Sequence, residues 1–233
     1  MCPHYIHFIT ASVNPFLMSG LDLRKKTIIV ESLIIVFVLY ALINMYFGFI
    51  QTVEFAVSTN ILLYYTNWSN ILAAIGAALS LYYLHKGTKL PRPVAILKLA
   101  STMMLTVTFL VVVLVLCPQG GIQILIDVGG MIFLHLFVPI LAALDFLFLA
   151  DMDALGKKEA VLSLVPMMLY AVGIITVLLI AGNDDLAPYP FLRIHSQPVY
   201  VTMLWTAGLF LLGYVLSYGY TKLGKRTNPS MKE

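Results

Sequence analysis

The chain has 233 residues, of which 61% are hydrophobic and only 11% are charged. A soluble globular domain carries roughly 25% charged residues, so this composition excludes an ordinary soluble protein and indicates an integral membrane protein. The formal net charge of +3 comes from connections between apolar runs, so we expect no nucleic-acid partner. The 2 cysteines are too few for a disulfide scaffold.

Long apolar runs divide the chain into segments of the length that crosses a bilayer. They predict an all-α fold, a six-transmembrane-helix bundle. We expect an N-terminal interfacial segment at 1–26, the six-span membrane domain at 27–221 and a basic cytoplasmic tail at 222–233. The expected spans are 27–50, 58–84, 93–116, 123–149, 160–181 and 198–221.

Basic residues fall at alternate ends of these spans. Because Lys and Arg are retained in cytoplasmic loops, this asymmetry predicts that both termini are cytoplasmic in a multi-pass protein of the cell membrane. Arg193 is the only basic residue that falls on the opposite side. The expected cytoplasmic side holds Arg24, Lys25, Lys26, Lys86, Lys89, Arg92, Lys157, Lys158 and the tail residues Lys222, Lys225, Arg226 and Lys232.

Three charged residues fall inside or beside the expected spans. Lys98 is close enough to its loop for its ammonium to snorkel to the cytoplasmic side. We expect Glu31 to pair with nearby basic residues at the interface, and Asp145 to bond a cytoplasmic-side Tyr or Lys.

A polar cluster interrupts the second expected span, in the sequence Tyr64-Tyr65-Thr66-Asn67-Trp68-Ser69-Asn70. Each unpaired hydroxyl or amide in hydrocarbon costs a few kcal/mol, so this cluster needs a specific role. Helical spacing of i, i+3 and i+4 places Thr66, Ser69 and Asn70 on one face. Counted from the start of its span, Thr66 lies about 12 Å below the outer surface at ~1.5 Å per residue.

His135 lies inside the fourth expected span, which enters the membrane from the same outer side. It falls about 18 Å down that span, a depth compatible with that of Thr66. A neutral imidazole can take the proton of a Thr hydroxyl, and an Asn amide can donate to an oxyanion. We therefore predict that Thr66 is a nucleophile, that His135 is its base, and that Asn67 or Asn70 stabilises the oxyanion.

An alternative interpretation gives these groups no chemistry, because Thr, Ser and Asn in membrane helices often serve only as hydrogen bonds between helices. Asp127 either guides a polar head group or is simply an acid stabilised at a helix N-terminus. Tyr189 begins an apolar stretch, 189–192, that we expect to fold back as a lid over the site. The residues predicted to contact substrate or oxyanion are Asn67, Trp68, Ser69, Asn70, Asp127 and Tyr189.

We expect no metal and no cofactor. His135 is the only His within an expected span, whereas a haem b held between two helices needs two axial ligands.

Three stretches of the chain resemble a known family. They are the Thr66 cluster, the segment His135-Leu136-Phe137-Val138-Pro139 followed by Asp145, and Tyr189-Pro190-Phe191-Leu192 before the last span. Together they resemble the androgen-inducible membrane hydrolase family, the intramembrane threonine hydrolases that include the androgen-dependent TFPI-regulating protein. The chain is more similar to the microbial branch of that family. The resemblance covers roughly 27–221 and matches Thr66 and His135 to the family's catalytic Thr and His.

The resemblance implies an intramembrane hydrolase of lipid esters, such as fatty acid esters of hydroxy fatty acids. The partners would be the lipid substrate and the bilayer, and the oligomeric state stays open. The alternatives are a small-molecule or ion transporter and a non-catalytic lipid-binding membrane protein. Against a transporter, the chain shows no inverted repeat and no paired breaks in corresponding spans.

Overall fold

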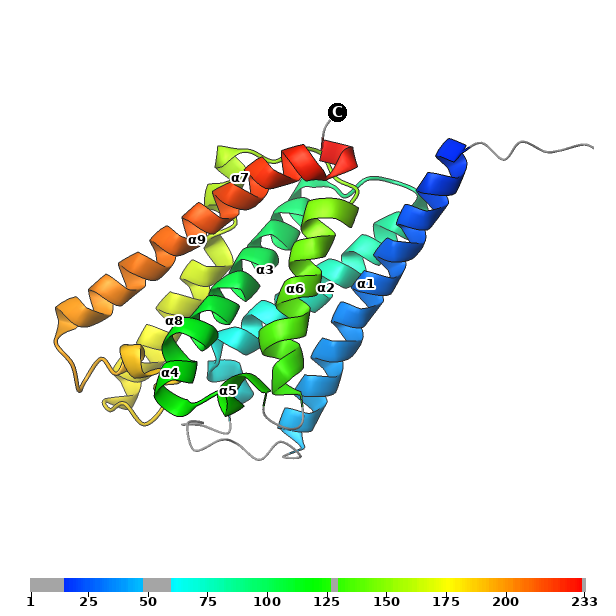
Figure 1. Ribbon diagram of the computed structural model, residues 1–233. Helices are drawn as coiled ribbons and strands as arrows, with labels where there is room; N and C mark the ends of the chain where they lie inside the picture. The colour runs from blue at the N-terminus through cyan, green and yellow to red at the C-terminus, as the bar shows by residue number, and fades with distance from the viewer. Residues whose placement is uncertain (1–14, 48–59, 127–129, 232–233) are drawn as a thin grey trace, which may run out of the picture.

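A computed structural model describes residues 15–47, 60–126 and 130–231, except the side chains of 15–21 and 126 (Figure 1). Within this part all regular structure is helical, apart from one isolated bridge between Leu90 and Met152, which confirms the all-α prediction. The α-helices are α1 (Pro15–Tyr46), α2 (Tyr65–Lys86), α3 (Arg92–Val111), α4 (Cys117–Gly120), α5 (Gln123–Ile126), α6 (Val138–Leu144), α7 (Lys157–Leu162), α8 (Val165–Ala181) and α9 (Val199–Thr227).

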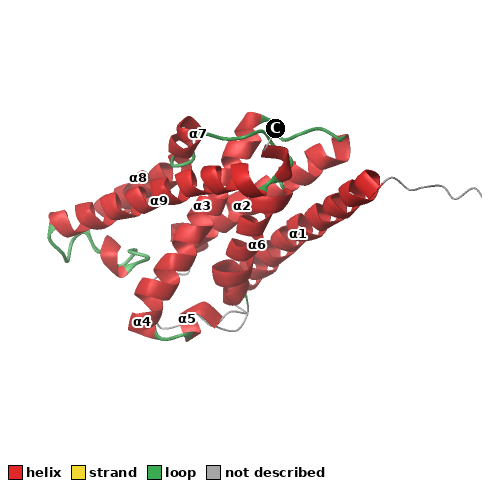
Figure 2. Ribbon diagram, turned by 45° about the horizontal axis from the view of Figure 1, so that its top comes forward, coloured by secondary structure: helices red, strands yellow, loops and turns green. Residues whose placement is uncertain are grey.

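α3 is the central helix of the bundle. It packs against α2, α6, α7, α8 and α9, and Figures 1 and 2 show it between α1 on one side and the α8–α9 pair on the other. Several of its side chains, including Leu99, Met103 and Leu105, are completely buried. α3 therefore divides the interior into two regions, and each region contains a group of buried polar side chains.

The described part of the chain contains 4 helices that are long and apolar enough to cross a membrane. They present large apolar side chains outward, with Ile180 at 82% and Val199 at 71% exposed. Contiguous apolar surface of this kind is unfavourable in water, so the molecule is a membrane protein. The 4 helices are Asp22–Tyr46, Arg92–Gly120, Lys157–Ala181 and Val199–Thr227, and a shorter apolar stretch covers Phe133–Leu149.

Several helix boundaries differ from the expected spans. The first helix begins at Pro15, inside the expected interfacial segment, and the last helix continues to Thr227, inside the expected tail. α2 begins only at Tyr65, so Thr66 lies in the first turn of its helix. Hydropathy measures how apolar a segment is and not whether its backbone is helical. The predicted start of the second span at residue 58 was therefore too early.

Two π-helical turns immediately precede prolines. The first is η2 (Val112–Leu116) before Pro118, and the second is η3 (Phe133–Phe137) before Pro139. Proline has no N–H to donate to the carbonyl four residues earlier, and the preceding N–H instead bonds a carbonyl five residues back, as Val138 does to Phe133. Such turns are frequent at functional sites, and His135 lies at the centre of η3.

The connections at one end of the bundle are joined by hydrogen bonds. Arg24 Nη2 donates to the Leu84 carbonyl at 3.2 Å, and the Leu90 N–H donates to the Asp151 carbonyl at 2.8 Å. Figure 1 shows the start of α1 and the C-terminal end of the described chain at this same end. Pro15 and Met231, the first and last described residues, therefore lie at the same end of the bundle.

Lys98 does not snorkel, contrary to the sequence prediction. It is buried and forms ion pairs with Glu31 of α1 and with Asp145, the first residue of the π-helical turn η4 (Asp145–Leu149). The prediction was wrong because two carboxyl groups from other helical segments contact the Lys98 ammonium inside the bundle. These partners are far from Lys98 in sequence, so the local pattern does not reveal them.

Gly130 allows α1 to approach the start of the His135 helix. Its φ is +132°, and a Cβ placed there would lie 2.9 Å from both Cα and Cβ of Ala41. We expect Gly130→Ala to lower the free energy of unfolding by about 1–3 kcal/mol through overpacking and backbone strain, measured by thermal denaturation in detergent. Gly208→Ala is the matched control, because nothing lies within 4 Å of that position; equal melting temperatures for the two variants would contradict the close-approach account.

Candidate functional site

The polar cluster provides hydrogen bonds to the carbonyl groups of the non-helical backbone that leads into α2. Asn67 Nδ2 donates to the Ile61 carbonyl at 2.6 Å, and Trp68 Nε1 donates to the Leu62 carbonyl at 2.7 Å. From α8, the Tyr170 hydroxyl donates to the Leu63 carbonyl at 2.8 Å. Irregular backbone at membrane depth is tolerated only where its polar groups find partners. These side chains therefore provide the hydrogen bonds that the short 3₁₀ turn η1 (Ile61–Leu63) needs.

Ser69 and Asn70 bind the backbone of Thr66. Ser69 Oγ and Asn70 Nδ2 both lie 2.8 Å from the Thr66 carbonyl, and Ser69 Oγ also lies 3.2 Å from the hydroxyl of Thr108 on α3. Asn70 Nδ2 also donates to the Leu134 carbonyl at 3.2 Å. Since two carbonyl oxygens face this amide nitrogen, both its N–H groups are engaged, and an oxyanion would have to compete for one of them.

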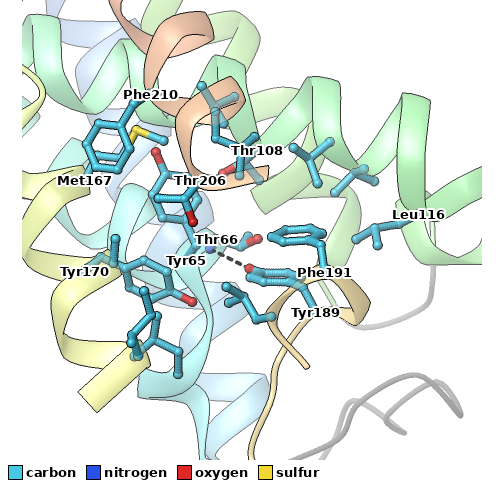
Figure 3. Close-up of a pocket in the computed structure, with 18 residues that line it drawn as sticks. Tyr65, Thr66, Thr108, Leu116, Met167, Tyr170, Tyr189, Phe191, Thr206 and Phe210 are labelled. Atoms are coloured by element: carbon cyan, nitrogen blue, oxygen red, sulfur yellow. Dashed lines mark hydrogen bonds between the residues drawn. The ribbon is translucent and has the colours of Figure 1, made fainter. Parts of the chain in front are cut away.

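A cavity opens beside the start of α2, between α3, α8 and α9 (Figure 3). Its empty volume is about 650 Å³, including the part open to the outside. The lining is apolar apart from a few hydroxyl groups. The lining residues with hydroxyl groups are Tyr65, Thr66, Thr108, Tyr170, Tyr189 and Thr206.

Tyr189 closes this cavity next to Thr66. The Thr66 N–H, which has no partner within the first turn of its helix, donates to the Tyr189 phenol oxygen at 3.4 Å. The Tyr189 ring stacks on Phe191, and Phe191 stacks on Trp205 of α9, each pair with centroids 5.2 Å apart. Figure 3 shows the Thr66 side chain directed toward this aromatic group.

Burial raises the pKa of Tyr189 to about 12, and its contacts with Thr66 oppose the rise. The phenol is therefore neutral across the physiological range, and its O–H is a donor beside the Thr66 hydroxyl. Tyr189 lies in the connection between α8 and α9, so the structure places this sequence-predicted residue in the cavity wall rather than on the outer surface.

His135 is 4% exposed, and its Nδ1 lies 3.1 Å from the Ile124 carbonyl. Because a carbonyl oxygen only accepts, Nδ1 carries the proton of the neutral imidazole and Nε2 is left as a base. His135 does not line the cavity, and among the described residues no hydrogen bond joins it to Thr66. The Asn70 amide, which binds both the Thr66 and Leu134 carbonyls, brings the two segments together.

The predicted residues therefore have different surroundings. Thr66 and Tyr189 share the cavity, Asn67, Ser69 and Asn70 are buried anchors of the backbone, and Trp68 is 40% exposed. Asp127 lies outside the described residues. The Thr66–His135 pair stays a prediction.

Sequence reasoning missed the wall that faces Thr66. Tyr170 is the one polar side chain in an otherwise apolar stretch of α8 up to that point, and this isolated hydroxyl was the available signal. Tyr65 lay inside the recognised cluster, but its buried hydroxyl has no hydrogen-bond partner among the described residues. The apolar lining from α8 and α9 carries no sequence signal, because any membrane helix has such residues.

No groups of His, Cys, Asp and Glu that would hold a metal ion occur in the part of the chain that the structure describes. No protein-family model, curated protein or solved structure matches the chain.

We expect Asn70→Ala to lower the free energy of unfolding by about 1–3 kcal/mol, because the Leu134 carbonyl loses this donor while the Thr66 carbonyl keeps Ser69 Oγ. Asn44→Ala is the matched control, since Asn44 also donates to a carbonyl one helical turn back, at 2.7 Å, but on an exposed part of α1. The measurement is thermal denaturation of both variants in the same detergent. If Asn44→Ala costs as much as Asn70→Ala, the anchoring role of Asn70 is wrong.

Proposed function

We propose that this membrane protein hydrolyses a lipid ester, with Thr66 as nucleophile and His135 as base. The observation that carries the proposal is the apolar cavity that ends at the Thr66 hydroxyl beside the Tyr189 phenol. An acyl chain fits such a lining, and the hydroxyl groups at its end suit the ester. The proposal also rests on the resemblance to the androgen-inducible membrane hydrolases.

In the proposed reaction, Thr66 Oγ1 attacks the ester carbonyl carbon while its proton passes to His135 Nε2. Proton transfer requires Nε2 within hydrogen-bond reach of the hydroxyl, directly or through one water. The tetrahedral intermediate expels the alcohol, which takes the proton from His135, and leaves an acyl ester on Thr66. Water then attacks this ester with His135 again as base, releasing the fatty acid and restoring the Thr66 hydroxyl.

Donors for the oxyanion are available at the start of α2. Tyr189 offers its O–H, and the Thr66 N–H that now contacts the phenol oxygen is directed to the same place. The N-terminus of a helix favours negative charge. Tyr189 is therefore the side chain that we assign to oxyanion stabilisation, in place of the engaged amide of Asn70.

We expect Thr66→Ala and His135→Ala each to reduce turnover of a lipid-ester panel on the order of 10³-fold. Thr66→Ala should also abolish labelling by a serine/threonine-hydrolase probe.

Tyr189→Phe should reduce kcat about 10²-fold by removing one oxyanion donor. Thr206→Val is the matched control, because Thr206 lines the same cavity from α9 and has no assigned chemistry. Turnover that survives both Thr66→Ala and His135→Ala would contradict the assignment of Thr66 as nucleophile and His135 as base.

A second candidate function, lipid binding without turnover, is favoured by the position of His135 outside the cavity wall. It predicts that lipid copurifies with wild type and with Thr66→Ala alike, with no hydrolysis by either. Ala171→Trp, which fills the cavity from α8, should remove the bound lipid in both cases. Native mass spectrometry together with the ester assay separates the two functions.

We also propose that the chain crosses the membrane six times with both termini in the cytoplasm. Exposed positions suit a test in a cysteine-free background: Thr88 and Lys225 near the basic end, and Asn183 in the connection after α8. An impermeant thiol reagent on intact cells should label Asn183→Cys and leave Thr88→Cys and Lys225→Cys unlabelled until the cells are opened. Labelling of Lys225→Cys on intact cells would reverse the orientation.

A further inference from the structure

A second buried polar group lies on the other side of α3, away from the cavity. Lys98 of α3 is 5% exposed, Glu31 of α1 is 0% exposed and Asp145 of η4 is 1% exposed. Lys98 Nζ lies 2.5 Å from Glu31 Oε1 and 2.5 Å from Asp145 Oδ2. One ammonium therefore contacts two carboxyl groups from two other segments, and neither Thr66 nor His135 takes part.

The charges in this cluster do not balance if both acids are ionised. Two carboxylates and one ammonium leave one negative charge in an interior where an uncompensated charge is strongly unfavourable. α2 contributes the Ser80 hydroxyl, which lies near Glu31 and carries no charge. Among the described residues, no basic side chain other than Lys98 forms an ion pair with either acid.

Each carboxyl group also has one oxygen without a partner. Glu31 Oε2 and Asp145 Oδ1 are fully buried and accept no hydrogen bond within the described part of the chain. Buried carboxylate oxygens are normally satisfied by donors. A proton on one of them would remove the excess charge and turn one unpaired acceptor into a donor.

We propose that Glu31, Lys98 and Asp145 form a buried proton-binding site, in which the two carboxyl groups together hold one proton beside the Lys98 ammonium. The cluster is then neutral, with one carboxylate, one carboxylic acid and one ammonium. A metal cation fits poorly, because the ammonium occupies the space between the carboxyl groups and hard cations require about six oxygen ligands.

The proton-binding site is independent of the proposed hydrolysis at Thr66. Intramembrane acids that pair with a lysine are the kind of group that binds protons in pumps and transporters. Asp145 lies ten residues after His135 in the same continuous helical segment. The proton-binding site therefore holds the C-terminal part of the segment that carries His135.

The test is infrared spectroscopy of the full chain in lipid nanodiscs at neutral to mildly alkaline pH. Exposed carboxyl groups, with ordinary pKa values of about 4, are then ionised and give no acid band. We expect wild type to show the carbonyl stretch of one protonated carboxylic acid, which shifts in heavy water. Selective ¹³C labelling of Asp or of Glu assigns the band without any substitution.

Glu31→Gln and Asp145→Asn should each abolish this band, because the remaining carboxylate is neutralised by Lys98. Glu159→Gln is the matched control, since the buried Glu159 carboxylate pairs with Arg92 at 2.7 Å and should contribute no acid band. Absence of the band in wild type, or its persistence in both Glu31→Gln and Asp145→Asn, would overturn the proposal. If a variant fails to fold, the isotope-labelled wild type still shows whether an Asp or a Glu side chain carries the proton.

Discussion

The structure depends on one constraint, that polar backbone groups inside an apolar bundle must find partners within the protein. Helices meet it internally, but the turn at 61–63 cannot. Its carbonyls are bonded by Asn67, Trp68 and Tyr170, so side chains from α2 and α8 hold the chain at the place where α2 begins. The polar cluster is therefore first of all a structural device, and the Thr66 hydroxyl is presented to the cavity as a result.

Proline affects the same hydrogen-bonding constraint, because it has no backbone N–H. Pro139 therefore leaves the helix without one of its regular hydrogen bonds, and the π-helical turn that precedes it contains His135. The imidazole is then oriented by the Ile124 carbonyl, which fixes the tautomer with a basic Nε2. His135 therefore has a ring nitrogen that can act as a base. Its contact with Thr66 is part of the proposed reaction.

α3 separates two kinds of buried polarity. On one side, neutral hydroxyl groups edge an apolar cavity. On the other, Glu31, Lys98 and Asp145 form a buried cluster of ion pairs. This separation keeps charged groups out of the apolar cavity, where their desolvation would be unfavourable.

Composition and hydropathy by themselves determined the membrane class, the all-helical fold and the approximate helical segments, because hydrocarbon imposes the same requirements on every spanning chain. They also singled out Thr66 and His135, since polar groups stand out in apolar runs. Only the tertiary structure decided where α2 begins, that Lys98 pairs with two acids instead of snorkelling, and that the Tyr189 phenol lies beside Thr66 while the Asn70 amide is bound to two carbonyl oxygens. These outcomes depend on contacts between residues far apart in sequence, which no local pattern records.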